Sequence, residues 1–236
     1  TQGVSSAASD VYKRQVLTRD RLKSFVLRKG RITANQKQAI ETLWDQYVLS
    51  TKEDINKFLL NRSSVLDIGF GAGETTTYLA KNMPESSILG AEVYLAGIGS
   101  TLSKSNEEGL NNIKILNSDI VPFLEETISD DSFDLVLMFY PDPWPKRKHH
   151  KRRLFQPNFL NLIHSKLKKN GIFYFKTDWS HYYQESSKIL LDDKNWLIQD
   201  ESELTPVLKA IPITSFERKA LKAQRDLKKI ILKKIS

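Results

Sequence analysis

Short apolar runs alternate with stretches of helical spacing along most of this 236-residue chain. Five runs are predicted to be strands, at residues 64–68, 87–93, 113–116, 133–139 and 171–176. Helical spacing lies before, between and after them, at residues 33–49, 74–83, 96–108, 123–128, 157–167 and 181–191. A last run at 227–234 predicts a strand at or near a sheet edge. This alternation is typical of right-handed crossovers and a parallel sheet.

Composition narrows the class of protein. A hydrophobic content of 40% with 10% aromatics suits one α/β core of catalytic size. The absence of cysteine excludes disulfides, thiolate nucleophiles and cysteine-ligated metals. No apolar stretch reaches the roughly 18–20 residues of a membrane span and no signal-peptide pattern is seen, so we expect a cytoplasmic protein with no membrane partner. The net charge of +8 favours an anionic partner.

The first residues do not look native to the domain. Residues 5–15 resemble the translation of a DNA-sequencing adapter, so we expect residues 1–15 to be an assembly scar. Residues 16–60 are predicted to form an N-terminal arm and a helix that packs on the main domain. That main domain is expected to span residues 61–236.

A glycine-rich turn follows the first predicted strand. In Asp67-Ile-Gly-Phe-Gly-Ala-Gly73, the glycines Gly69, Gly71 and Gly73 permit a tight turn and close approach of a cofactor. The spacing differs from the Gly-x-Gly-x-x-Gly that holds a dinucleotide pyrophosphate, and Glu74 would repel a phosphate. A neutral or cationic ligand therefore suits this turn better than a dinucleotide, and a turn without any ligand is the alternative.

Two more acids follow the next two predicted strands. Glu92 ends the second strand, where a carboxylate can bind both ribose hydroxyls. Asp119 follows the third strand and could receive an adenine amino group or a neighbouring backbone donor. Either acid alone could be a solvated loop residue. Together with Asp67 they stand at three successive strand ends, outside which open parallel sheets bind their ligands.

A stiff, basic segment follows the fourth predicted strand. Tyr140-Pro-Asp-Pro-Trp-Pro-Lys-Arg-Lys-His-His-Lys-Arg-Arg153 places Asp142 between prolines, which favour an extended backbone. Asp142 and Trp144 offer a hydrogen-bond acceptor and a stacking face to a nucleobase, and the cations can grip a polyanion. On its own, the run of cations from Lys146 to Arg153 could be a solvated face, but its position beside the Asp142 loop indicates RNA contact. His149 and His150 lie among cations, which disfavours their protonation, and we predict no metal.

These motifs resemble two nested families. Residues 60–180 resemble S-adenosylmethionine-dependent methyltransferases. The match to bacterial tRNA (guanine-N7-)-methyltransferases spans about residues 24 to 217 and rests on segments 24–32, 66–73, 90–93, 140–153, 176–179 and 214–217. It implies a doubly wound, mostly parallel seven-stranded α/β sheet of the class I methyltransferase, Rossmann-like type. It also implies S-adenosylmethionine as cofactor and methylation of guanine N7 in tRNA, at position 46 of the variable loop.

The same resemblance assigns roles to individual residues. The cofactor pocket would be lined by the three glycines and by Asp67, Glu92, Asp119 and Asp142. Asp142 would also be the catalytic residue. The substrate guanosine would be held by Lys146, Asp178, Thr214, Ser215, Phe216 and Glu217. RNA would be contacted by Lys148, His149, His150, Lys151, Arg152 and Arg153.

The chain departs from the family pattern in the glycine turn and in the C-terminal motif, where residues 220–225 also replace a usual glycine and histidine. Asp67 stands where members usually have Glu, Ser215 where they usually have Lys, and Lys219 where they usually have Arg. The RNA-contacting region on the C-terminal side therefore departs furthest from the family pattern. An RNA-binding protein without catalysis remains an alternative, as does a nicotinamide-dependent oxidoreductase, against which the glycine spacing and Glu74 argue. A monomer and a homodimer are both open.

The expected chemistry needs no general base. Guanine N7 carries an in-plane lone pair, so no proton has to leave before methylation. The protein would align the methyl group with N7, and Asp142 and Asp178 would offset the positive charge that moves to the purine. They would also accept the guanine N1 and N2 hydrogens. Because N7 in folded tRNA is often paired, the base would be drawn out and stacked on Trp144 or Trp179.

Overall fold

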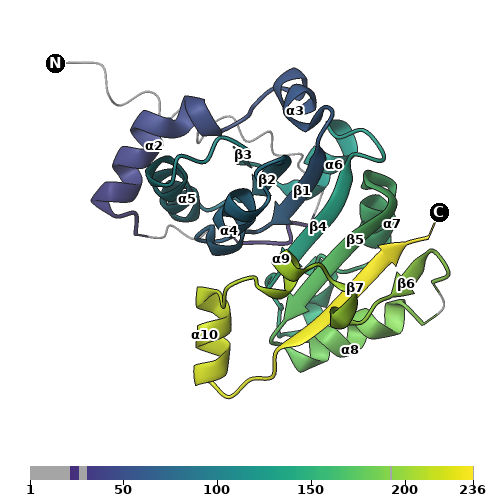
Figure 1. Cartoon of the computed structure of the whole chain (residues 1–236). Helices are drawn as coiled ribbons and strands as arrows, with labels where there is room; N and C mark the ends of the chain where they lie inside the picture. The colour runs from purple at the N-terminus through teal and green to yellow at the C-terminus, as the bar shows by residue number, and fades with distance from the viewer. Residues whose placement is uncertain (1–21, 27–30, 192, 236) are drawn as a thin grey trace.

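A seven-stranded sheet forms the centre of the molecule, with strand order β3-β2-β1-β4-β5-β7-β6 (Figure 1). The computed structural model describes residues 22–26, 31–191 and 193–235. The strands are β1 (Ser63–Ile68), β2 (Ser86–Ala91), β3 (Ile113–Leu116), β4 (Phe133–Phe139), β5 (Leu167–Thr177), β6 (Trp196–Ile198) and β7 (Lys228–Lys234). Strands β1 to β5 are parallel, and β7 runs antiparallel to both β5 and β6. The predicted mostly parallel, doubly wound α/β sheet is confirmed.

Helices cover both faces of this sheet (Figure 1). One face carries α2 (Ala34–Tyr47), α4 (Glu74–Asn82), α5 (Leu95–Glu107) and α9 (Pro206–Lys209). The other carries α3 (Lys52–Leu59), α6 (Ile120–Glu126), α7 (Pro157–Lys166) and α8 (Ser180–Ile189). Two 3-10 turns, η1 (Arg147–Arg152) and η2 (Glu201–Glu203), and helix α10 (Ser215–Lys222) lie in the connections.

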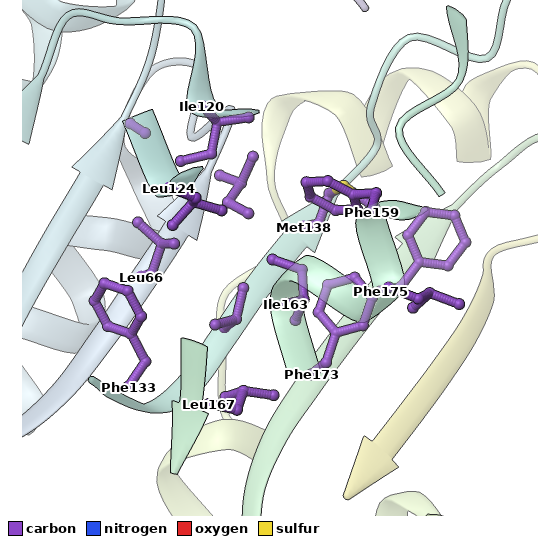
Figure 2. Packing of buried hydrophobic residues seen from close by; sticks show 14 of the residues in the cluster. Leu66, Ile120, Leu124, Phe133, Met138, Phe159, Ile163, Leu167, Phe173 and Phe175 are labelled. Carbon is purple, nitrogen blue, oxygen red and sulfur yellow. The ribbon is translucent and has the colours of Figure 1, made fainter. Parts of the chain in front are cut away.

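Two apolar clusters hold these layers together. Neighbouring residues of a strand point to opposite faces, so Leu66 of β1 packs in one cluster and Val65 in the other. Figure 2 shows the first cluster, in which Phe159 and Ile163 of α7 pack against the sheet. Each such fully buried side chain contributes about 1.5–3 kcal/mol to the free energy of unfolding. The two clusters together hold the carboxyl ends of the strands in fixed relative positions.

Helix α2 packs on α5, as expected for the helix that precedes the main domain. A β-carbon at Gly99 would lie 2.7 Å from Gln36 O, so only glycine allows this approach. Gln36 Nε2 also donates to Ser100 Oγ at 2.8 Å. The expected scar at residues 1–15 and part of the arm lie outside the described residues, so the division into domains stays a prediction. Among the residues described, no helix combines the length and apolar character needed to cross a bilayer.

Some elements differ from those predicted. Strand β6 was missed because it has only three residues, and two of them, Leu197 and Ile198, are exposed. Strand β5 begins at Leu167, immediately after α7, because Leu167 pairs with Phe133 and is fully buried. Helices α3, α9 and α10 were also missed. The tail strand was expected at or near an edge, and β7 lies next to the edge strand β6.

The strand order reverses between β1 and β4. The chain passes from β1 to β2 and β3 on one side of this point, and β4 and β5 lie on the other. Ligands of open α/β sheets bind in the crevice at such a reversal, outside the carboxyl ends of the strands. The predicted site residues that follow β1, β2, β4 and β5 all lie at this end of the sheet.

Candidate functional site

The glycine turn after β1 has the geometry that its sequence predicted. Gly69, Gly71 and Gly73 have φ angles of 69°, 61° and 77°, in the left-handed region that favours glycine. The Gly69 N–H donates to Ala91 O at 2.8 Å, which ties the turn to β2. No atom lies within 4 Å of the point where a β-carbon at Gly69 would stand, so the turn is open on that side to a ligand.

Asp67 lies beneath this turn at the end of β1 and is 1% exposed. Its Oδ2 accepts a hydrogen bond from Thr76 Oγ1 of α4 at 2.7 Å. Burial raises the pKa of Asp67 to about 7, and the nearby Glu92 charge adds to this, whereas the bond from Thr76 opposes it. A buried carboxylate with this pKa would be stabilised in its ionised form by a cationic ligand.

Glu92 follows β2 and fixes the glycine turn from the other side. Its Oε2 accepts from Gly71 N at 2.9 Å, and its Oε1 accepts from Val93 N at 2.6 Å and Tyr94 N at 3.0 Å. Burial raises the pKa of Glu92 despite these bonds, and the charge of Asp142 raises it further. Glu92 and Asp142 therefore belong to one electrostatic site.

Asp119 follows β3 and caps helix α6. Its Oδ1 accepts a hydrogen bond from Val121 N at 3.3 Å, which is the arrangement of an N-cap residue. The sequence allowed two partners for Asp119, an adenine amino group and a neighbouring backbone donor, and the backbone donor is present. Contact of Asp119 with an adenine stays a prediction.

Asp142 stands on a bent loop after β4. Tyr140 and Trp144, two residues to either side, have φ angles of 53° and 44°. For aromatic residues such backbone costs about 1–3 kcal/mol each, which the surrounding contacts must offset. The prolines predicted an extended segment, and this expectation is wrong at these two positions. Asp142 itself is exposed, and its charge reaches Glu92.

The Trp144 side chain already has a hydrogen bond at its ring nitrogen and contacts with other side chains around its ring. Its Nε1 donates to Ser24 O at 2.8 Å, so the N-terminal arm reaches this loop. The Arg152 guanidinium lies 4.7 Å from the Trp144 ring centroid, and the His149 ring packs edge-on at 5.7 Å. A base that stacks on Trp144 would therefore have to replace Arg152 or use the opposite face.

A pocket of about 300 Å³, which includes space open to solvent, lies between the glycine turn and the loop after β4. It combines two carboxylates with aromatic rings, and it is lined by Asp67, Gly69, Phe70, Glu74, Thr75, Phe139, Tyr140, Thr214 and Phe216. Carboxylates and aromatic faces together suit a positively charged ligand.

Helix α10 begins at this pocket. Thr214 is its N-cap and forms a capping box with Glu217. Glu74 Oε2 accepts from Ser215 N at 2.8 Å, and Glu74 Oε1 accepts from Arg218 at 2.5 Å. Burial opposes ionisation of Glu74, but these donors outweigh it and lower its pKa. The Glu74 carboxylate, which stands where the Gly-x-Gly-x-x-Gly pattern has its last glycine, therefore holds α10 against α4.

A second anchor holds α10 from the side of β4 and β5. Glu217 is 5% exposed, and its Oε1 accepts from Tyr140 OH at 2.8 Å and from Lys176 Nζ at 3.1 Å. Burial opposes its ionisation, yet the Thr214 backbone N–H and Lys176 lower its pKa. Phe216 points to the glycine turn, because its ring would lie 3.2 Å from a β-carbon at Gly71.

Asp178 lies at the carboxyl end of β5, where its side chain is 16% exposed and pairs with Arg225 at 2.6 Å. The alternative that Asp178 caps the next helix is not seen, since Trp179 is the N-cap of α8 and no side chain caps it. Trp179 is partly buried against the core. Lys146 is exposed just before η1.

Comparisons with known proteins agree with this geometry. Residues 61–230 match a family model described as "Putative methyltransferase". A tRNA (guanine-N(7)-)-methyltransferase of Psychromonas ingrahamii is 34% identical over 220 residues, covering 92% of this chain and 90% of that protein. One of Escherichia coli (strain UTI89 / UPEC) is 37% identical over 204 residues, covering 84% and 85%. The chain belongs to the tRNA (guanine-N7-)-methyltransferase family.

Solved structures show the same fold for this family member. The 16S rRNA methyltransferase KamB matches with a TM-score of 0.56 at 16% identity, covering 80% of this chain and 95% of that one. A 30S ribosomal A1408 methyltransferase from an uncultured bacterium matches with a TM-score of 0.54 at 22% identity, covering 79% and 95%. The class I methyltransferase fold predicted from the motifs is therefore confirmed.

The basic block of this methyltransferase, residues 146–153, has an outer side that is exposed to solvent and an inner side that faces the protein. Lys148 and Lys151 are exposed on η1. Burial and the surrounding cations lower the pKa of His149, in the direction that the sequence predicted. His150 is half-buried and its Nδ1 lies 3.4 Å from Glu185 Oε1 of α8. Contact of the outer residues with RNA stays a prediction.

Arg153 lies on the inner side, where it is buried against other residues, and its contact with RNA stays a prediction. Its side chain is 1% exposed and pairs with Glu185. Its Nε donates to Pro143 O at 2.8 Å, and its guanidinium lies 4.7 Å from the Tyr182 ring centroid. The chain turns inward after η1, because Phe155 is buried in the core, and this carries Arg153 beneath the surface.

The structure brings several predicted residues together and adds others. Asp67, Gly69, Thr214 and Phe216 meet around the pocket. Glu92 holds the glycine turn and lies within the electrostatic reach of Asp142, whereas Asp119 and Asp178 have partners of their own. Two anchoring groups were missed, Tyr140 and Lys176, which hold Glu217. Both stand in motifs that were recognised, but their partner is about forty to eighty residues away in sequence, so only the fold reveals the contact.

Proposed function

We propose that this protein transfers the methyl group of S-adenosylmethionine to N7 of guanine in tRNA, forming N7-methylguanosine and S-adenosylhomocysteine. Membership of the tRNA (guanine-N7-)-methyltransferase family carries this proposal. The arrangement of the site supports it, because a carboxylate-lined pocket lies beside the Asp142 loop and its basic block. The nicotinamide alternative finds no support in this pocket, because the Glu74 carboxylate that lines it would repel a pyrophosphate.

The residues at the pocket fit the cofactor. Asp67 and Glu74 line it with negative charge, and the open side of Gly69 admits a ligand close to the backbone. S-adenosylmethionine supplies an electrophilic methyl group on a positively charged sulfur. Asp67 would hold its ammonium group, and Glu92 has acceptor capacity left for ribose hydroxyls beside its three backbone bonds. Asp119 would bind at the adenine end.

The chain's own residues contribute alignment and electrostatics. Guanine N7 needs no deprotonation, so no general base is required and Asp142 acts through position and charge. Asp142 lies close enough to Glu92 to raise the pKa of that residue, and thus at the cofactor side of the guanine. Asp178 and the motif Thr214–Glu217 would hold the base from the opposite side. Holding the reacting atoms about 3–3.5 Å apart and in line contributes several kcal/mol.

We assign the tRNA contact to the outer side of the basic block. Lys146, Lys148 and Lys151 are exposed beside Asp142, and exposed cations bind phosphates without reading sequence. The target is the guanine at position 46 in the variable loop. A cytoplasmic location and the absence of a bound metal remain predictions.

A methyl-transfer assay tests the function. The protein is incubated with bulk tRNA and S-adenosylmethionine carrying a labelled methyl group, and the tRNA is digested to nucleosides. We expect label in N7-methylguanosine. Binding of tRNA without transfer would instead support the alternative of an RNA-binding protein that lacks catalysis, which the departures at Ser215 and Lys219 motivated.

A further inference from the structure

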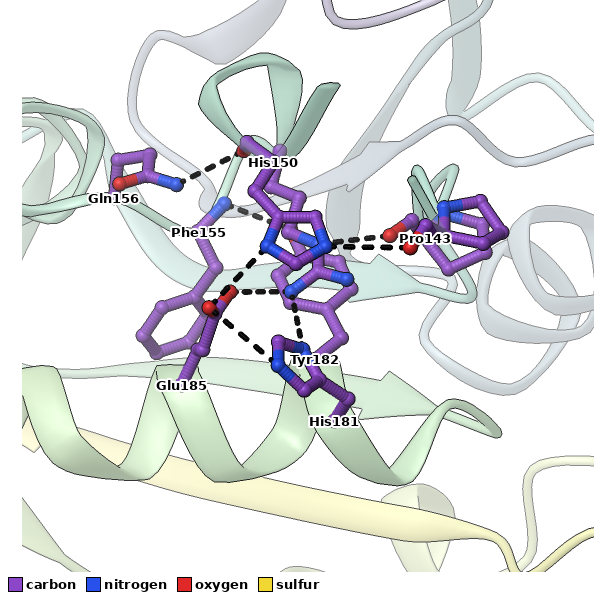
Figure 3. Close-up of polar contacts among 9 residues, drawn as sticks. Pro143, His150, Phe155, Gln156, His181, Tyr182 and Glu185 are labelled. Carbon is purple, nitrogen blue, oxygen red and sulfur yellow. Dashed lines mark hydrogen bonds and ion pairs between the residues drawn. The ribbon is translucent and has the colours of Figure 1, made fainter. Parts of the chain in front are cut away.

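Arg153 joins the Asp142 loop to helix α8. Its Nε donates to Pro143 O at 2.8 Å, and Pro143 directly follows Asp142. Its other arm forms an ion pair with Glu185 and lies 3.1 Å from His181 Nδ1, both on α8 (Figure 3). A planar guanidinium can make these contacts at once because its donors point in different directions.

Glu185 is the centre of this cluster. Besides Arg153, its carboxylate faces His150 Nδ1 at 3.4 Å and His181 Nε2 at 3.8 Å (Figure 3). His150 in turn lies 3.4 Å from Pro145 O, further along the same loop. Arg153 therefore joins one carbonyl group of the Asp142 loop to a carboxylate of α8, and His150 lies beside both that carboxylate and a second carbonyl group of the loop.

The same groups could suggest a cation site, because ligand atoms of His150, His181 and Glu185 lie within 4.8 Å of one another. The Arg153 guanidinium already brings a positive charge to this place. It pairs with Glu185 and approaches His181 to 3.1 Å. A metal ion would have to displace this buried cation, so the cluster is better suited to holding the loop.

The loop needs such support. Tyr140 and Trp144 have left-handed backbone, which persists only when surrounding contacts fix it. Asp142 is exposed between them. Helix α8 follows directly after Asp178, so a brace from the loop to α8 also sets the separation of the two carboxylates assigned to the guanine.

We propose that Glu185 and Arg153 are positioning residues that hold the Asp142 loop for methyl transfer, while the outer cations of the block bind tRNA. This rests on the proposed function for its kinetic consequence. Its structural consequence is independent: loss of Glu185 leaves Arg153 without its carboxylate, and the loop from Tyr140 to Arg153 becomes more mobile whether or not the protein transfers methyl groups.

The test compares Glu185→Ala with Glu185→Gln and with Asp130→Ala. Asp130 pairs at 2.6 Å with Lys166, whose side chain is 9% exposed, so Asp130→Ala also deprives a buried cation of its partner. This pair lies near Asp131 and Ser165, at the opposite end of the strands from Asp142. It controls for general loss of stability.

Hydrogen exchange and single-turnover transfer are measured at a temperature below the thermal unfolding midpoint of every variant. We expect Glu185→Ala to speed exchange of the peptide 140–153 at least fivefold and to lower the transfer rate at saturating tRNA at least tenfold. Glu185→Gln keeps an acceptor for Arg153 and should restore both values to within about threefold of the parent. Asp130→Ala should change neither.

Unchanged exchange of the 140–153 peptide in folded Glu185→Ala would overturn the proposal, as would an equal effect of Asp130→Ala. If Glu185→Ala does not fold, Arg153→Gln decides. It should lower the transfer rate without changing the salt dependence of tRNA binding, whereas a fall of the log–log slope by about 0.7–0.9 would show that Arg153 contacts a phosphate. A parent protein that transfers no methyl group would contradict the proposed function alone, since the exchange result stands by itself.

Discussion

At the scale of single residues, Asp67 links the site to pH. Its pKa of about 7 means that it is half protonated near neutrality in the ligand-free protein. A cationic cofactor prefers the ionised carboxylate. Below pH 7 the protein must lose a proton to bind it, so affinity falls as pH falls.

The prediction is that affinity for S-adenosylmethionine drops about tenfold per pH unit between roughly pH 7 and 5.5. Isothermal titration at several pH values measures this, and buffers with different ionisation enthalpies would reveal the released proton. Asp67→Asn should bind more weakly and lose most of the pH dependence. Equal affinity of the parent at pH 5.5 and pH 8 would mean that Asp67 does not pair with the cofactor.

Asp178 is the second residue with a testable role. We expect Asp178→Ala to retain cofactor affinity and to slow methyl transfer about 30- to 1,000-fold, because loss of a charged acceptor costs roughly 2–4 kcal/mol in the transition state. Arg225→Ala is the matched control, since it removes only the present partner of Asp178. Single-turnover rates decide, and equal losses in both variants would reduce Asp178 to an ion-pair partner of Arg225.

Individual residues were predictable where their role depends on local sequence. Asp67 and Glu92 stand at the ends of apolar runs, and the glycines between them indicate a turn. Their proximity at the strand ends could therefore be foreseen. The burial of Arg153 could not be foreseen, because it depends on where Phe155 enters the core. Glu74 was recognised as hostile to phosphate, but its bonds to Ser215 and Arg218 join positions more than 140 residues apart.

At the scale of elements, α10 carries the substrate motif and depends on two anchors. Glu74→Ala removes the anchor on α4, so we predict faster hydrogen exchange across residues 214–222 and a higher KM for tRNA. Glu108→Ala breaks another partly exposed ion pair, with Lys81 at 3.2 Å, and serves as the control. If exchange in α10 is the same in both variants, Glu217 alone holds the helix.

Elements were predictable in proportion to their burial. Strand β4 is almost wholly buried, and its continuous apolar run announces a central strand. Helix α10 is short and held by polar contacts instead, and β6 exposes two of its three residues. Segments of eight and three residues are too short for hydrophobic periodicity to distinguish helix from strand, so both emerged only from the folded chain.

At the scale of the whole molecule, the net positive charge of the chain is brought next to the site by the exposed cations of η1. Lys148 and Lys151 are both exposed on η1. We predict that replacing both by alanine lowers the slope of log affinity for tRNA against log salt by about 1.4–1.8, since each phosphate contact contributes roughly 0.7–0.9. Cofactor affinity should not change. An unaltered slope in filter-binding experiments would show that this side of η1 is only a solvated surface.

The central claim is that the site methylates guanine N7 in tRNA, and substitution of a single atom tests it most directly. Two tRNA transcripts are compared, one with guanosine at position 46 and one with 7-deazaguanosine there, which has carbon in place of N7. We predict transfer of one methyl group to the first, mapped by mass spectrometry to N7 of that guanine, and none to the second. Equal methylation of both transcripts, or a methyl group on another atom, would contradict the account.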